Sequence, residues 1–373
     1  MLTDEQRYVL SLLQKSFGLR TESAAVPEDT QQLLRCIQKN GILLTVFQSL
    51  PPALQEPLRT RYYAAVRQAV LQSCEGERVL QALSEAGLDC IALKGWELRK
   101  LYPNTTMRQM ADLDILVKPY EYSRICAAME KLGYRGEGES SWKHDSFRKG
   151  EVHIEMHKRL TDDSGAIQAW ERELWSRAER VEGRVYRMAP EDFAVFHFVH
   201  LHKDFMNGSL GLRRIADTWL LSRQPTDTEQ VKRRLETFGM GRFYERMLHL
   251  ARASLGEEEA DPGAELLLAH AFTYGIYGSD RSYKAGRIAA MGGSLRSGKL
   301  RSAIAAVFLP YSRMKAQFPI LQKHPLLLPY CWLKRIVRFL RGDRKRSRVR
   351  LDYTGIREED YREMKRFFEA GGV

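Results

Sequence analysis

The chain has 373 residues, of which 44% are hydrophobic and 28% charged, so its composition excludes wholesale disorder and is typical of a folded protein of about two packed units. The formal net charge is +12 at pH 7, but the positive charge is concentrated. Residues 334–350 contain nine Lys or Arg residues and one acid, which leaves +8 there and +4 in the rest of the chain. This distribution argues against a nucleic-acid surface that covers the whole protein and confines the basicity to a C-terminal tail.

Five cysteines are widely separated and form no CxxC pair, which favours reduced, mostly buried thiols. The N-terminus carries charges within its apolar pattern, unlike a secretory signal. No apolar run reaches the roughly 18 residues that a membrane span needs. We therefore expect a cytoplasmic protein, with peripheral membrane association as an option for the basic tail.

The first part of the chain, from Asp4 to about Ala86, has apolar residues at three- and four-residue spacing, which predicts several helices. Residues 89–94 then form a short β-prone run that leads into Gly95 and a short helix. Leu113 to Val117 is almost continuously apolar, which predicts a strand buried on both faces. A helix opened by Pro119 is expected to follow it and to end at Gly133.

Residues 142–147 and 151–157 are predicted to form two further strands, joined by a hairpin turn at Lys149 and Gly150. Residues 185–188 add another strand, and helical periodicity returns from Pro190 to about Leu255. The expected fold is α+β: a small mixed β-sheet core with flanking helices and a mainly helical C-terminal region. The expected regions are 1–85 (helical), 86–189 (α/β core), 190–340 (helical) and 341–373 (basic tail and final helix).

Two carboxylates stand at alternate positions at the start of the predicted strand 113–117. Residues i and i+2 of a strand point to the same face, so Asp112 and Asp114 should project together while Leu113 and Ile115 enter the core. Neighbouring carboxylates repel, and each pKa should rise unless a cation lies between them. A hard divalent ion with oxygen ligands, such as Mg²⁺, would provide that charge.

A third carboxylate is expected on the adjacent strand. The period of two places His153, Glu155 and His157 on one face of residues 152–157. Three acids from two strands could hold two metal ions that bridge a triphosphate and neutralise the leaving pyrophosphate. A zinc site of His153, Glu155 and His157 is an alternative, but the neighbouring Asp pair favours a harder ion.

Phosphate binding is expected where the first strand meets its helix. The strand that ends in Leu93 and Lys94 runs into a helix at Gly95, which offers a cation and backbone N–H groups. Glycine also lets another group approach the backbone closely.

The motifs occur in the order Leu93-Lys94-Gly95, Arg-x-x-x-Asp-x-Asp (108–114), Leu-Gly-Tyr (132–134) and Glu-x-His (155–157). This order resembles an uncharacterised nucleotidyltransferase family of bacteria in the polymerase-β-like superfamily. The resemblance covers about residues 86–160, and extends more loosely through HxxHxHK (197–203) and LPxxWLKR (328–335).

The resemblance implies roles for individual residues. It assigns metal ligation and catalysis to Asp112, Asp114 and Glu155, and contact with the triphosphate to Lys94, Gly95 and Arg108. His157 is expected to lie behind the ligands or at the substrate. The superfamily usually has Gly-Ser where this chain has Lys94-Gly95, so the resemblance does not identify the nucleotide.

Two other patterns have simpler interpretations. Residues 293–299 satisfy most of a P-loop, but Leu300 stands where a Mg²⁺-binding Ser or Thr is required, so we expect a basic loop. His197, His200 and His202 cluster on a predicted helix, where packing or hydrogen bonding is expected ahead of zinc binding. Arg213, in the same region, is a candidate for contact with phosphate.

The sequence therefore predicts a nucleotidyltransferase that uses Mg²⁺ or Mn²⁺ to transfer NMP from an NTP to a hydroxyl acceptor, which it does not identify: a small molecule, a sugar, a protein or RNA. Two alternatives stay open: a non-catalytic nucleotide- or nucleic-acid-binding protein that keeps the fold, and a toxin-type nucleotidyltransferase that modifies tRNA. The tail at 334–350 could be solvated, or could contact RNA or an anionic membrane. The oligomeric state is not predicted.

Overall fold

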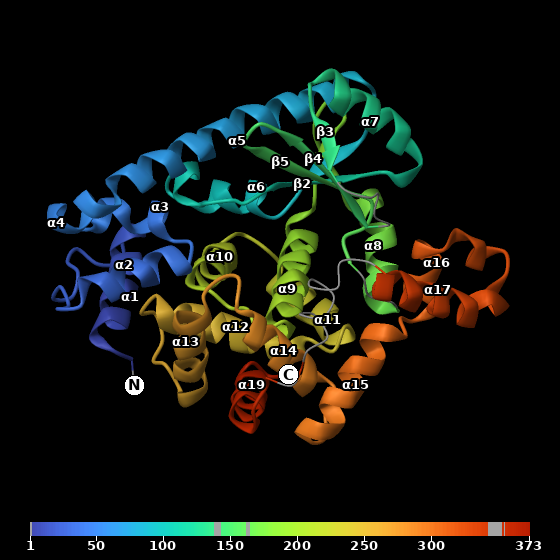
Figure 1. Ribbon diagram of the computed structural model, residues 1–373. Helices are drawn as coiled ribbons and strands as arrows, with labels where there is room; N and C mark the ends of the chain where they lie inside the picture. Colours follow the sequence, from blue (N-terminus) through green and yellow to red (C-terminus); the bar gives the residue numbers. More distant parts are fainter. Residues whose placement is uncertain (1, 138–142, 162–164, 342–352, 354) are drawn as a thin grey trace. The chain divides into compact units, whose positions relative to one another are not determined.

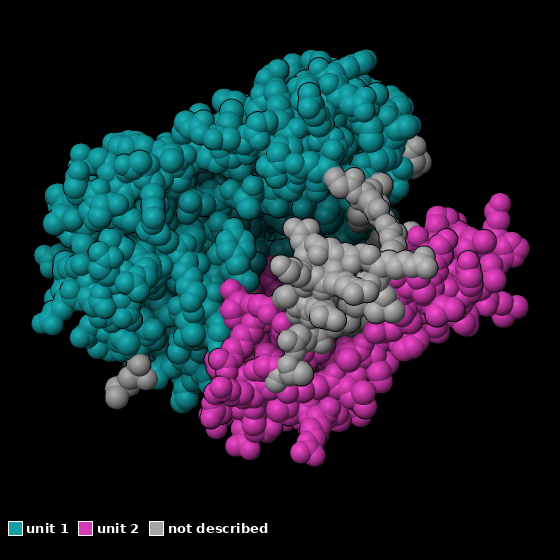
Figure 2. Space-filling model, viewed as in Figure 1, with its two compact units in different colours: residues 1–203, 210–277, 370–373 teal, residues 204–209, 278–369 magenta. Residues whose placement is uncertain are grey.

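A computed structural model describes residues 2–137, 143–161, 165–341, 353 and 355–373 of the chain (Figure 1). These residues form two compact units, coloured separately in Figure 2. Unit 1 contains residues 1–203, 210–277 and 370–373, and unit 2 contains residues 204–209 and 278–369. Position 142 of one predicted strand and positions 342–350 of the basic tail lie outside the described residues.

One mixed sheet in unit 1 contains the seven strands of the described residues, in the order β3-β4-β5-β2-β1-β7-β6. The strands are β1 (Cys90–Ala92), β2 (Leu113–Val117), β3 (Arg135–Glu137), β4 (His144–Lys149), β5 (Val152–His157), β6 (Glu179–Glu182) and β7 (Val185–Arg187). The sheet and the many helices around it confirm the predicted α+β class.

The centre of the sheet is the pair β2 and β5, which run parallel, while β2 and β1 run antiparallel. The predicted strand at Leu113–Val117 is confirmed, and all five of its residues are buried. The predicted hairpin is found, but its turn lies one residue later than predicted, at Gly150 and Glu151: β4 and β5 pair antiparallel with Lys149 opposite Val152, and Gly150 has a positive φ of 57°.

One face of this sheet is covered by two helices, α5 (Arg59–Glu85) and α7 (Tyr122–Lys131), as Figure 1 shows. Leu113, Ile115 and Val117 of β2 pack there, together with Ile154 and Met156 of β5. Because side chains alternate along a strand, the residues between them project to the opposite face. That opposite face carries Asp114 and Glu155.

Helices complete both units. The other helices of unit 1 are α1 (Asp4–Ser16), α2 (Thr30–Lys39), α3 (Leu43–Val46), α4 (Pro52–Gln55), α6 (Gly95–Leu98), α8 (Ala166–Arg177), α9 (Pro190–Met206, whose last residues belong to unit 2), α10 (Leu212–Ser222), α11 (Thr228–Thr237), α12 (Gly241–Ser254) and α13 (Pro262–Tyr274). Those of unit 2 are α14 (Asp280–Ala290), α15 (Leu295–Val307), α16 (Tyr311–Gln317), α17 (Leu328–Arg341) and α19 (Glu358–Ala370, whose last residue belongs to unit 1). No helix in the described part of the chain is long and apolar enough to cross a membrane.

Two sequence-based expectations need correction. The stretch 293–299 is not a loop: Ser294 caps helix α15, and its side chain accepts a hydrogen bond from the backbone of Ser297. The thiols are free, as expected, but they are not mostly buried, because Cys74 is exposed and only Cys90 and Cys331 are fully buried. Apolar residues at three- and four-residue spacing predict a helix, but this spacing does not show whether a cysteine on that helix faces the core or the solvent.

Candidate active site

Two carboxylates predicted from the sequence lie side by side on the polar face of the sheet. Asp114 of β2 is the direct register partner of Glu155 of β5. Asp112 precedes β2 and is half-buried, whereas the side chain of Asp114 is only 5% exposed. The predicted strand geometry therefore brings the carboxylates of two separate sequence motifs to one place.

Asp114 is contacted by a lysine and a histidine. Lys94 Nζ donates to Asp114 Oδ1 at 2.7 Å, and His157 Nε2 lies 2.6 Å from the same oxygen. Burial alone would raise the pKa of Asp114, but Lys94 and His157 outweigh it and hold this pKa well below its usual range. Burial would likewise lower the pKa of His157, yet its hydrogen bonds to Asp114 and Glu155 raise it. Asp114 is therefore ionised and paired.

Asp112 behaves differently from Asp114. Burial and the negative charge of Asp114 raise the pKa of Asp112 to about 6, although Lys94 opposes the shift. The raised pKa expected for neighbouring carboxylates is thus found at Asp112, and the positive charge of Lys94 acts to lower the pKa of both acids. The site keeps one firmly ionised carboxylate and one that titrates near neutral pH.

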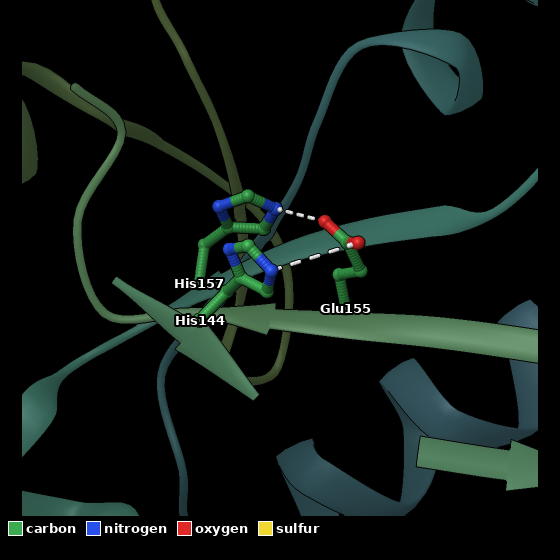
Figure 3. Close-up of side chains that lie close together, drawn as sticks. All are labelled: His144, Glu155 and His157. Atoms are coloured by element: carbon green, nitrogen blue, oxygen red, sulfur yellow. Dashed lines mark ion pairs between the residues drawn. The ribbon is translucent and has the colours of Figure 1, made fainter. Parts of the chain in front are cut away.

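Two sets of side chains among the described residues could hold a metal ion, each with its ligand atoms within 4.8 Å of one another. One set is Asp112, His153 and Glu155, and the other is His144, Glu155 and His157. Figure 3 shows the second set, in which both imidazoles point toward the Glu155 carboxylate. The Nε2 atoms of His157 and His144 lie 3.2 and 3.7 Å from its oxygens.

These donors fit a divalent ion. The first set combines two carboxylates with one imidazole; carboxylates suit Mg²⁺ or Mn²⁺, and the imidazole adds a ligand suited to transition ions. Glu155 belongs to both sets, whereas Asp114 belongs to neither and is paired with Lys94 and His157. The geometry therefore favours Glu155 over Asp114 as the central ligand.

His144 is a site residue that the sequence reasoning did not identify. It lies on β4 directly opposite His157, and the two rings are 5.1 Å apart. Once the turn at Gly150 is accepted, counting outward along the hairpin places His144 beside His157. The hairpin register was thus the available signal.

The connection between β1 and α6 has an unusual backbone. Lys94 has a φ of 42°, and it is the only residue other than glycine with a positive φ in the described chain. A side chain in this region is strained, and such strain persists where the surroundings enforce it. Gly95 follows, and a Cβ there would lie 2.6 Å from Arg108 Nη1 and 2.8 Å from Met110 Sδ. Gly95 therefore makes room for protein atoms.

The structure gives Arg108 and Arg213 different partners from those expected. Arg108, expected to face the triphosphate, forms a buried bidentate ion pair with Asp217 of α10, at 2.7 and 2.8 Å. Arg213, a candidate for phosphate contact, donates from Nη1 to the carbonyl oxygen of Gln109 at 2.7 Å. Both guanidinium groups thus bind the protein itself, because the segment before Asp112 passes beside α10.

The histidines of helix α9 lack the environment of a metal site. His197 is buried and forms a hydrogen bond with Thr218 at 2.9 Å. Burial lowers the pKa of His197 to about 4, so the ring is neutral at pH 7. His202 packs edge-on against Phe243. These contacts agree with the packing interpretation of the sequence.

Comparison with known proteins identifies the site's family. A family model described as an uncharacterised nucleotidyltransferase matches residues 26–256, more than half of the chain. The chain belongs to this family. The protein is therefore a transferase, and this nucleotidyltransferase carries Asp112, Asp114, Glu155 and Lys94 within the matched segment.

Two solved structures of the antibiotic-resistance factor ANT(2'')-Ia are also similar to this nucleotidyltransferase. A solution structure has 17% identity, covers 46% of this chain and 92% of that chain, and gives a TM-score of 0.35. A crystal structure with adenylyl-2''-tobramycin has 16% identity, covers 51% and 99%, and gives a TM-score of 0.28. At these TM-scores, neither similarity defines a substrate for this nucleotidyltransferase. No curated protein matches the chain.

Proposed function

We propose that this nucleotidyltransferase holds an NTP with Mg²⁺ or Mn²⁺ on the polar face of β2 and β5, and transfers NMP to the hydroxyl of an acceptor. The observation that carries this proposal is the meeting of Asp112, Asp114 and Glu155 beside Lys94 on one face of the sheet. Their convergence from two strands, next to a lysine, is what a metal-triphosphate site requires.

Asp112, Glu155 and His153 are the proposed principal metal ligands because they form one set, and Asp114 joins them when the ion displaces Lys94 or His157 from its carboxylate. When bound, a divalent ion supplies positive charge against the triphosphate oxygens and the leaving pyrophosphate. Lys94 supplies an ammonium group at the same place. Excess positive charge beside an anionic leaving group is the main contribution expected of such a site.

The reaction balances as a displacement at the α-phosphorus. The acceptor oxygen forms a bond to this phosphorus, the bond to the oxygen that bridges to the β-phosphate breaks, and pyrophosphate leaves. The acceptor's proton passes to a carboxylate. Asp112 is one candidate to accept it, because its carboxylate lies at the site. Glu155 is a second candidate for this step.

Calorimetry with each of the four NTPs in the presence of Mg²⁺ or Mn²⁺ tests the proposal. We expect the wild type to bind at least one NTP in a metal-dependent manner, and Asp112→Ala with Asp114→Ala to abolish that binding, because the variant loses two of three carboxylates. Circular dichroism on the variant shows whether it remains folded. A wild type that binds no NTP with either ion would contradict the proposed function.

A further inference from the structure

The segment that leads into the site is held by side chains from outside the sheet. It runs from Asn104 to Ala111, one residue before Asp112, and its regular structure is a single turn of 3₁₀ helix at Thr105–Met107. Backbone groups in such a segment need partners other than those of a strand or an α-helix. The position of Asp112 therefore depends on what holds residues 104–111.

Helices that precede and follow the α/β core in the sequence supply these partners. Three side chains donate hydrogen bonds to carbonyl oxygens of the segment: Thr45 Oγ1 (α3) to Met107 at 2.8 Å, Arg213 Nη1 (α10) to Gln109 at 2.7 Å, and Gln72 Nε2 (α5) to Met110 at 3.3 Å. All of these residues belong to unit 1. The segment is thus fixed at three points along its backbone.

A fourth attachment is the side chain of Arg108. Its Nε and Nη2 donate to the two carboxylate oxygens of Asp217, and the Tyr102 hydroxyl donates to Asp217 Oδ1 at 2.9 Å. The side chains of Arg108 and Asp217 are 9% and 3% exposed. A buried bidentate pair adds little net stability once desolvation is counted, but it fixes the geometry of both partners.

Arg108 also touches the other half of the site. A Cβ on Gly95 would lie 2.6 Å from Arg108 Nη1, so the guanidinium lies directly against the backbone that follows Lys94. A shift of Arg108 would therefore disturb both the strained turn at Lys94 and the approach to Asp112. One ion pair thus connects α10 to both halves of the site.

We propose that Asp217 is a positioning residue: through Arg108 it fixes the segment 104–111 and so places Asp112 and Lys94 for nucleotide binding. Asp217 itself contacts neither the nucleotide nor the ion. The link to nucleotide binding rests on the proposed function. The link between Asp217 and the order of residues 104–111 does not, so the two can be tested apart.

Asp217→Asn is the direct test. The amide NH₂ of asparagine would face a guanidinium N–H, so one of the two hydrogen bonds to Arg108 is lost while the size of the side chain is kept. We expect hydrogen exchange of residues 104–112 to accelerate by at least about tenfold, the factor expected for losing one buried charged hydrogen bond. We expect the affinity for Mn²⁺ with ATP, GTP, CTP or UTP to fall by at least about tenfold, as for other groups that orient metal ligands.

Asp192→Asn is the matched control. Asp192 is also buried, accepts two hydrogen bonds from Arg177 and one from Trp170 Nε1, and holds no residue of the segment 104–111 in any of these contacts. The Asp192→Asn variant should be less stable than the wild type, but its hydrogen exchange at residues 104–112 should be no faster and its nucleotide binding no weaker. Equal behaviour of the two variants in exchange and affinity would show that Asp217 is merely structural and overturn the proposal.

Thr45→Val keeps the test valid if Asp217→Asn does not fold. This isosteric change removes only the hydrogen bond to Met107, and we expect about threefold faster exchange of residues 104–112 with a smaller loss of affinity in the same direction. Unchanged hydrogen exchange in this variant would show that the hydrogen bond from Thr45 to Met107 does not fix the segment. If the wild type binds no nucleotide, the proposed function fails, while the exchange measurements still decide whether Asp217 and Thr45 fix the segment.

Discussion

Replacing Glu155 by glutamine is expected to weaken Mn²⁺ binding by at least about hundredfold, more than the loss of a group that merely orients a ligand. Glu155 is the one residue shared by the two sets that could hold an ion. Glutamine keeps the size of the side chain and removes its charge, so the change acts on the ligand and spares the packing. The free Mn²⁺ signal in electron paramagnetic resonance gives the affinity directly.

Glu151→Gln is the control for this variant. Glu151 lies in the turn immediately before β5, and its exposed side chain pairs with Arg67 away from the acids. It should bind Mn²⁺ as the wild type does. If Glu155→Gln bound Mn²⁺ within about threefold of this control, Glu155 would not be the central ligand.

Replacing Lys94 by methionine is expected to destabilise the metal-free protein by about 3 kcal/mol at pH 7. This is the lower end of the range for removing one partner of a buried ion pair, because a quarter of the Lys94 side chain is exposed. The variant leaves Asp112 and Asp114 without their ammonium, so Mn²⁺ alone should raise its melting temperature more than that of the wild type. Thermal unfolding in EDTA, and then with Mn²⁺, measures both effects.

The stability difference should also depend on pH. In the wild type the lowered pKa of Asp114 contributes stability above the ordinary aspartate pKa, and this is lost as pH falls. Without Lys94 the Asp114 pKa rises, so protonation relieves the repulsion and the variant gains relative stability on acidification. In EDTA the difference in the free energy of unfolding between the two proteins should therefore be largest near pH 7 and should decrease as the pH falls toward 4.

Lys118→Met is the matched control for Lys94→Met. Lys118 pairs with Asp89, and the side-chain exposures of 25% and 8% resemble those of the Lys94 pair. Arg184 also binds Asp89, so a cation remains there after the substitution. An equal Mn²⁺ response in the two variants would show that Lys94 does not compensate the acids of the site.

The central strands could be predicted from sequence because their signal is local. Leu113 to Val117 is apolar at every position except Asp114, and 152–157 alternates strictly, so both strands and the polar face of β5 followed from neighbouring residues. Strands β3 and β6 and helix α8 were not predicted. All three residues of β3 are exposed, and β6 is mostly exposed, so neither has the apolar alternation that marks a strand.

The partners of the site residues could not be predicted, because they lie far apart in the chain. Arg108 and Asp217 are separated by 109 residues, and nothing near either one indicates the other. The partner of Lys94 could not be predicted for the same reason. The sequence placed this lysine near phosphate, whereas the fold brings its ammonium group to Asp114. Local patterns define strands and faces, whereas ion pairs between distant segments depend on tertiary packing.

Nucleotidyl transfer itself is tested most directly by the position of the transferred label. The wild type is incubated with a cell extract, Mn²⁺ and each NTP, labelled with ³²P at either the α- or the γ-phosphate. Above the labelling of extract alone, we expect the wild type to label an acceptor from the α-phosphate and not from the γ-phosphate, and expect Glu155→Gln to add no label. Transfer of the γ-label that depends on the wild-type protein, or equal added α-labelling by the wild type and Glu155→Gln, would contradict the proposed reaction.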